Sequence, residues 1–127
     1  MNLESDLARV RGLGSAKDGT HHFWHQRLTA IALIPLCLWF MVSLVCVMDA
    51  SYLEASEWIK TPHVMILLVA LIFSLVYHAK LGLQTVIEDY VHLESVKLGA
   101  VICLNLGAAL CGLVCIVAIL KISFGIN

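Results

Sequence analysis

The stretch Leu28–Met48, LTAIALIPLCLWFMVSLVCVM, contains no charged residue. An α-helix rises about 1.5 Å per residue, so about 20 apolar residues cross the ~30 Å hydrocarbon layer of a membrane. Pro35 lies inside the stretch, where membrane helices tolerate proline with a gentle kink. The stretch therefore predicts a transmembrane helix.

Two further apolar runs follow along the chain. The second, 63–87, is interrupted by the ionisable residues His78 and Lys80, whereas the third, 98–120, carries no charge. The third run is also rich in Gly, Ala and Cys, which let neighbouring helices approach closely. Between the first two runs, Asp49–Pro62 is a polar connection.

These runs predict an all-α integral membrane protein. In the connection, Tyr52 and Trp58 fit the aromatic belt at a membrane surface. We expect a single domain, 1–127, made of an N-terminal segment, 1–27, and a bundle, 28–120, of three transmembrane helices at about 28–48, 63–87 and 98–120.

The composition excludes a soluble domain. Of 127 residues, 61% are hydrophobic and 13% charged, against about 45–50% and about 25% in soluble domains. The net charge of −1 gives no indication of nucleic-acid binding. The five cysteines lie in the apolar runs without a C-x-x-C pair, so we expect packing residues and no disulfide framework.

Positive charges near the helix ends predict the orientation. The N-terminal segment and the second loop, which lie on the same side of the membrane, carry most of them: Arg9, Arg11, Lys17, Arg27 and Lys97. The other side has Lys60 in the first loop and Lys121 after the third run. We expect Lys80 to snorkel toward that same side. The N-terminus and second loop are therefore predicted to be cytoplasmic. The polar segment 1–27 does not resemble a signal peptide, so the first helix is expected to be an uncleaved insertion signal.

His78 is the first candidate for chemistry, because an ionisable residue inside a membrane helix is costly and needs a reason. It is either a neutral histidine hydrogen-bonded to a neighbouring helix or a ligand, most simply an axial haem ligand. Helical spacing gives it a small or polar stripe on one face: Ser74, His78, Gly82, Thr85 and Asp89. We expect Gly82 to leave room for a flat cofactor, and a partner to cover this stripe.

Asp89 and Tyr90 lie at the predicted membrane border, roughly 16 Å along the helix from His78. Taken singly, a border tyrosine is usually an interfacial anchor and a border aspartate a solvated helix end. The functional alternative is that Tyr90 donates a hydrogen bond to a quinone carbonyl while Asp89 orients it or relays protons.

The run Gly19–Arg27, GTHHFWHQR, precedes the first membrane helix. His21 and His25 are one turn apart, but neither a carboxylate nor a cysteine completes a metal site. An interfacial Trp24 with an anchoring Arg27 is the simpler interpretation. The sharper one pairs Arg27 with anionic groups such as haem propionates, because a guanidinium suits carboxylates.

Two of these runs resemble a known family. HAKLGLQTVIEDY, His78–Tyr90, resembles the haem-and-quinone motif of a succinate dehydrogenase membrane anchor family, in which Asp-Tyr follows a helix-two histidine by eleven residues. SAKDGTHHFWHQRLTA, Ser15–Ala30, resembles the same family's N-terminal segment in its alphaproteobacterial and mitochondrial-like branch. Length, helix number and topology agree with this family over nearly the whole chain.

The resemblance implies a membrane anchor of succinate:quinone oxidoreductase, respiratory complex II, in a bacterial inner membrane. His78 would be one axial ligand of haem b, and Tyr90 would hydrogen-bond ubiquinone beside Asp89. Arg27 and His21 would lie near the haem propionates and the quinone. The implied partners are the flavoprotein, the iron–sulfur protein and the second anchor, cytochrome b556. No activity is expected in isolation, since this chain has neither a G-x-G-x-x-G motif nor a cysteine cluster.

Two other functions remain open from the residues. The first is a haem-free structural or assembly protein of the membrane in which His78 only packs. The second is a small transport protein that uses His78, Lys80 and Asp89 as a proton relay. The fumarate reductase anchors are a close variant of the family interpretation.

Overall fold

The structure, a computed structural model, describes residues 17–125 and the side chains of residues 20–125. Within this part of the chain it contains helices and no strand. The helices are α2 (Lys17–Val47), α3 (Tyr52–Lys60), α4 (Pro62–Tyr90) and α5 (Glu94–Phe124). Arg9 and Arg11, on which the predicted orientation partly depends, lie outside the described residues.

Three of these helices are long and apolar enough to cross a membrane: Thr20–Val47, Pro62–Tyr90 and Glu94–Phe124. The prediction of an all-α protein with three transmembrane helices is therefore confirmed. Each helix extends beyond its apolar run. The runs mark the residues suited to the hydrocarbon layer, but helical hydrogen bonding continues into the polar border on either side.

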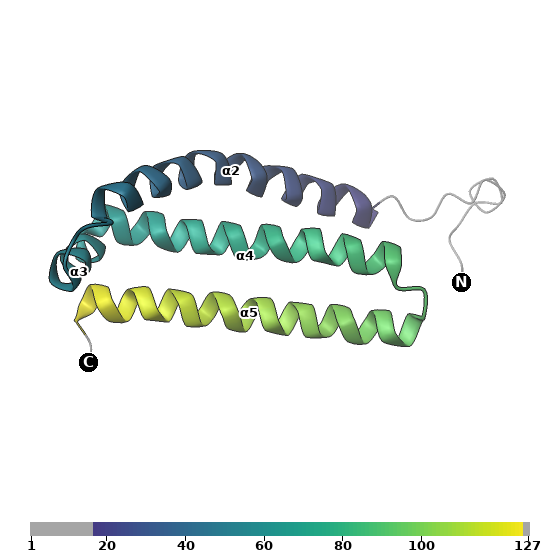
Figure 1. Cartoon of the computed structure of the whole chain (residues 1–127). Coiled ribbons are helices and arrows are strands. Elements are labelled where there is room, and N and C mark those ends of the chain that lie inside the picture. The colour runs from purple at the N-terminus through teal and green to yellow at the C-terminus, as the bar shows by residue number, and fades with distance from the viewer. Residues whose placement is uncertain (1–16, 126–127) are drawn as a thin grey trace, which may run out of the picture.

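The first membrane helix begins well before the predicted position 28. Residues 17–27, expected to belong to a separate N-terminal segment, are the first turns of α2. The helix runs unbroken through Pro35, near its middle, and Figure 1 shows it as a continuous, gently bowed ribbon.

α4 is the central helix. Figure 1 shows α2 and α5 on either side of it, each antiparallel to α4, and both pack against it. The buried apolar side chains all belong to α4: Val64, Leu68, Leu71 and Leu81. Most of the other large apolar side chains of the described residues are exposed, as expected for helices that face lipid or another protein.

Gly112 lets α5 approach α4 closely. It is the one buried residue of α5, and a Cβ built on it would lie 3.7 Å from Cγ1 of Val76 on α4. That distance is ordinary van der Waals contact, so a methyl group fits beside Val76. Small residues at such crossings provide packing contacts that replace the hydrophobic effect inside a membrane.

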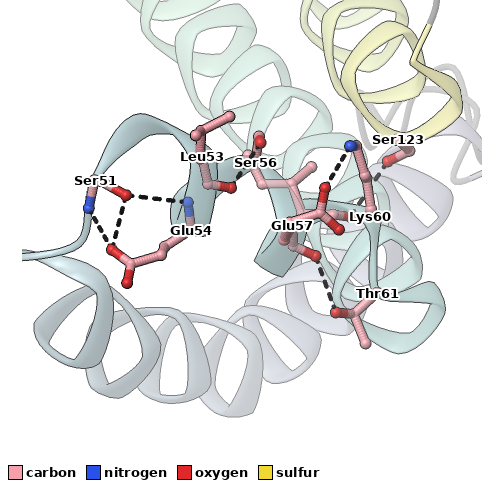
Figure 2. A network of polar contacts seen from close by, with 9 residues as sticks. Ser51, Leu53, Glu54, Ser56, Glu57, Lys60, Thr61 and Ser123 are labelled. Carbon is pink, nitrogen blue, oxygen red and sulfur yellow. Dashed lines mark hydrogen bonds and ion pairs between the residues drawn. The ribbon is translucent and has the colours of Figure 1, made fainter.

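The connection expected between the first two membrane helices contains the short helix α3. Ser51 caps it: the Ser51 hydroxyl accepts from the Glu54 amide, and the Ser51 amide donates to the Glu54 carboxylate at 2.7 Å (Figure 2). This backbone hydrogen bond, helped by the Ser51 hydroxyl, lowers the pKa of Glu54 below its ordinary value. The contact therefore stabilises α3 at neutral pH and is lost as the pH falls through that lowered pKa.

α3 closes one end of the bundle. The indole of Trp58 stacks on Trp39 of α2, with ring centroids 6.2 Å apart, and the hydroxyl of Ser123 on α5 donates to the carbonyl of Ile59 at 3.3 Å. Figure 2 shows Ser123 beside this end of α3. Trp58 thus packs against a neighbouring helix, whereas Tyr52 is exposed.

We expect Gly112→Leu to destabilise the packing of α5 on α4. The larger side chain must push against Val76, and overpacking of this kind costs about 1–3 kcal/mol. The melting temperature of the detergent-solubilised protein complex measures the effect. Gly112→Ala is the matched control and should melt within a degree or two of the wild type (~0.5 kcal/mol or less). A Gly112→Leu variant that melts like the control would contradict this account of the helix crossing.

Candidate functional site

A line of polar side chains on α2 faces the polar stripe on α4. Positions 22, 26 and 29 share one face of α2, as positions 78, 82 and 85 share one face of α4, because they are spaced by three or four residues. The two helices are antiparallel (Figure 1), and Thr29 lies against His78 as Gln26 lies against Gly82. We call this interface the polar seam, made of His22, Gln26 and Thr29 on α2 and His78 and Gly82 on α4. Thr85, the next residue on this face of α4, is exposed and lies outside it.

One ring nitrogen of His78 contacts α2 within the polar seam. Its Nδ1 is 3.0 Å from the hydroxyl oxygen of Thr29, and the side chain is half-buried. Thr29 therefore occupies Nδ1, and Nε2 is the ring nitrogen left for a ligand. α2 also supplies part of the cover that was expected only from a partner chain.

A side chain of α2 lies in the space beside Gly82. A Cβ built on Gly82 would lie 3.6 Å from Nε2 of Gln26, so the glycine accommodates a side chain of α2. The room for a flat cofactor beside Gly82 stays a prediction, and on this side of α4 it would have to be shared with the Gln26 side chain. Sequence periodicity identifies a helix face, but not which neighbour packs on it.

Two polar atoms of the seam are buried without a protein partner. Among the described residues, Nε2 of His22 and Oε1 of Gln26 have no hydrogen bond. Such atoms cost free energy unless water or another group satisfies them. The polar seam is therefore suited to hold water between α2 and α4.

A second polar contact joins the same helices on another side. The hydroxyl of Tyr77 and Nδ1 of His25 share a hydrogen bond of 2.9 Å. The His25 ring also lies 6.5 Å from that of His21, between centroids. His21 and His25 are thus arranged as neighbouring rings on α2, with Tyr77 as the contact on α4.

Lys80 lies beside Tyr77 on α4, with its Nζ 5.7 Å from the centre of the Tyr77 ring. It lines an apolar cleft of about 380 Å³ between α4 and α5, together with Asn105, and it has no ion pair among the described residues. The snorkelling of Lys80 toward the cytoplasmic side stays a prediction.

Asp89 and Tyr90 are the last two residues of α4. Both side chains are exposed, Tyr90 by 77%, and neither has a hydrogen-bond partner among the described residues. They lie at the end of the bundle where α2 begins (Figure 1). This chain therefore presents both groups at one end but does not enclose a pocket around them.

Arg27 and His21 are exposed on the first part of α2. The Arg27 guanidinium carbon lies 4.4 Å from the centre of the Phe23 ring, which supports the side chain by a cation–π contact. Arg27 is two residues before Thr29, the contact of His78. No cluster of three or more His, Cys, Asp or Glu residues with metal-site geometry occurs in the described part of the chain.

The structure thus joins His78 to α2 and places Asp89, Tyr90, Arg27 and His21 in the same half of the bundle. Sequence reasoning missed Thr29 and Gln26. A signal was available, because Gln26 and Thr29 follow His22 at positions i+4 and i+7 and so share its helix face.

Comparison with known proteins supports a family assignment. Residues 1–120 match the model of the succinate dehydrogenase/fumarate reductase transmembrane subunit. The succinate dehydrogenase hydrophobic membrane anchor subunit of Rickettsia bellii is 34% identical over 119 residues, which cover 93% of this chain and 94% of that protein. The protein of the same name from Rickettsia conorii is 32% identical over 98 residues, which cover 76% of this chain and 77% of that protein. The one from Rickettsia typhi is 29% identical over 120 residues, which cover 93% of this chain and 94% of that protein.

No solved structure matches this chain. The assignment therefore rests on the sequence comparisons. The family match covers nearly all of the chain, and the Rickettsia bellii protein agrees with it over nearly its whole length. The chain belongs to the family of succinate dehydrogenase and fumarate reductase transmembrane subunits, among the hydrophobic membrane anchor subunits of succinate dehydrogenase.

Proposed function

We propose that this membrane anchor supplies one axial ligand of haem b and part of a ubiquinone site in succinate:ubiquinone oxidoreductase. The observation that carries the proposal is the half-buried His78 in the middle of a membrane helix, held at Nδ1 by Thr29 with Nε2 left for iron. Electrons from succinate would pass through iron–sulfur clusters of a partner to ubiquinone near Tyr90.

The donor set fits a haem shared between two chains. A neutral imidazole binds iron through one nitrogen while the other donates a hydrogen bond, and His78 has such a partner at Nδ1. This chain offers a single ligand, so the second would come from the cytochrome b556 anchor. Bound there, haem b supplies one-electron storage beside the route to the quinone.

Arg27 and His21 are the groups proposed to lie near the haem propionates. Arg27 is exposed, and its guanidinium stays available to an anion while Phe23 supports it. Its fixed positive charge pairs well with a carboxylate. His21 is also exposed, one turn before His25 on the same helix.

Tyr90 and Asp89 are proposed to form this chain's part of the quinone site. The Tyr90 hydroxyl would donate a hydrogen bond to a quinone carbonyl, holding the head group at the membrane border. The Asp89 carboxylate would orient the phenol or pass on a proton. Since both side chains are exposed, the remaining walls of the pocket would come from partner chains.

The chain is proposed to act only within the complex. Its partners would be the flavoprotein, the iron–sulfur protein and the second anchor, in a bacterial inner membrane. The described cysteines are free and spread along α2 and α5, so they offer no ligand set for an iron–sulfur cluster. A relay of His78, Lys80 and Asp89 is less well supported, because the contact of the Lys80 ammonium group is with the Tyr77 ring and it has no ion pair among the described residues.

A topology assay tests the predicted cytoplasmic N-terminus. Fused after Gly125 at the end of α5, alkaline phosphatase should be active and green fluorescent protein dark. Fusions after Lys97, at the start of α5, should give the opposite pattern, because the second loop is predicted to be cytoplasmic. The reversed pair of results would refute the orientation.

His78→Ala tests the haem ligand. We expect the purified complex to lose most of its b-type absorbance in a dithionite-reduced minus oxidised spectrum, because an alanine cannot ligate iron. His63→Ala, at the exposed start of α4, is the matched control and should keep the spectrum. An unchanged b-type spectrum in His78→Ala would exclude His78 as the axial ligand.

Tyr90→Phe tests the quinone contact, because it removes only the hydroxyl. We expect ubiquinone reduction by succinate to fall about tenfold, the equivalent of about 1.4 kcal/mol for one lost hydrogen bond. Succinate oxidation by an artificial acceptor should persist. Tyr52→Phe, at the exposed start of α3, should change neither rate. Wild-type quinone reduction in Tyr90→Phe would remove the residue from the site.

A further inference from the structure

Thr29 contacts three hydrogen-bonding atoms through one hydroxyl group. Its Oγ1 lies 2.8 Å from the carbonyl oxygen of His25, 3.0 Å from that of Gln26 and 3.0 Å from Nδ1 of His78. The two carbonyls belong to its own helix, one turn back. The histidine belongs to α4, so this hydroxyl joins the two helices.

The single hydroxyl proton decides the direction of these bonds. A carbonyl oxygen can only accept, so when Thr29 donates its proton along α2, to His25 or Gln26, its oxygen is left to accept a hydrogen bond from His78. The oxygen then faces His78 with a lone pair and accepts a hydrogen bond from Nδ1–H. In this arrangement the neutral imidazole carries its proton on Nδ1 and its lone pair on Nε2.

We infer that Thr29 is a positioning residue for the haem ligand, selecting the Nδ1–H tautomer of His78 and fixing its ring so that Nε2 faces the iron. The inference rests on the proposed function of His78. Thr29 itself touches neither iron nor substrate in this account. It acts through His78.

The local geometry makes Thr29 suitable for this task. A threonine in a helix has two accessible χ1 rotamers, because its hydroxyl can bond a carbonyl three or four residues back. The bonds to His25 and Gln26 thereby hold Oγ1 in place before any ligand binds. The contact with His78 is also partly buried, which limits competition from water.

The hydrogen bond has a predictable effect on a bound haem. An acceptor at Nδ1–H raises the basicity of the imidazole, which favours the ferric over the ferrous state. Removing the acceptor should therefore raise the midpoint potential of the haem. A ring that is no longer held should also change the electron paramagnetic resonance signal of the ferric haem, since that signal depends on ligand orientation.

The test uses the purified complex with Thr29→Val, which keeps the shape of the side chain and removes the hydroxyl. We expect a more positive midpoint potential and a shifted ferric g value. Thr29→Ser retains the hydroxyl and should restore both toward wild type. Thr85→Val is the matched control, because the Thr85 hydroxyl makes the same bond within its helix, to Leu81 at 3.1 Å, and none to His78 among the described residues.

Wild-type potential and g values in Thr29→Val would overturn the inference. If Thr29→Val assembles without haem, retention of haem in both Thr29→Ser and Thr85→Val supports it. Loss in Thr85→Val as well would assign the effect to general packing and overturn it. The outcome is separable from the proposed function, since only an unchanged spectrum in His78→Ala removes the ligand itself.

Discussion

The hydrocarbon layer supplies no water, and the rest of this structure follows from that constraint. Each backbone N–H and C=O must bond inside its own segment, so the three crossing segments are unbroken helices. The same rule applies to side chains. A histidine in the middle of α4 needs a polar neighbour, and α2 supplies one in Thr29. The polar seam is therefore the place where the chain satisfies its own polar groups, with two buried atoms, on His22 and Gln26, still without a protein partner.

The helices could be predicted from the sequence, because a charge-free run of about 20 residues has few other solutions. The ends of the helices could not be predicted in this way. Hydrophobicity shows which residues suit the hydrocarbon layer, whereas a helix continues until a cap or a turn ends it. The short α3 was missed although Ser51 and Glu54 have the spacing of a capping box. That signal predicts a helix start even in a polar connection, where the apolar pattern carries no information.

For the site, sequence reasoning identified His78 and its polar stripe but not what lies against them. Periodicity places residues on a face, whereas the neighbour depends on how helices pack. Lys80 shows the same limit. Helical spacing separates it from the face of His78, but does not predict that its Nζ lies beside the Tyr77 ring. The roles of Tyr90, Asp89, Arg27 and His21 stay predictions, because this chain alone leaves all four exposed.

The exposed apolar surface leaves most of this chain for lipid or other chains to cover. Only four apolar side chains of the described residues are buried, all on α4. The three long helices form a row with α4 in the middle and have little core between them. A row of helices cannot surround a ligand. A group bound at Nε2 of His78 must therefore have its far side covered by another chain, and the surface of α2 and α4 next to the polar seam is the natural place for that chain to pack. Cofactor binding and the association of the two chains would then use the same face of this chain. A substitution there that weakens cofactor binding should also weaken the association of the chains.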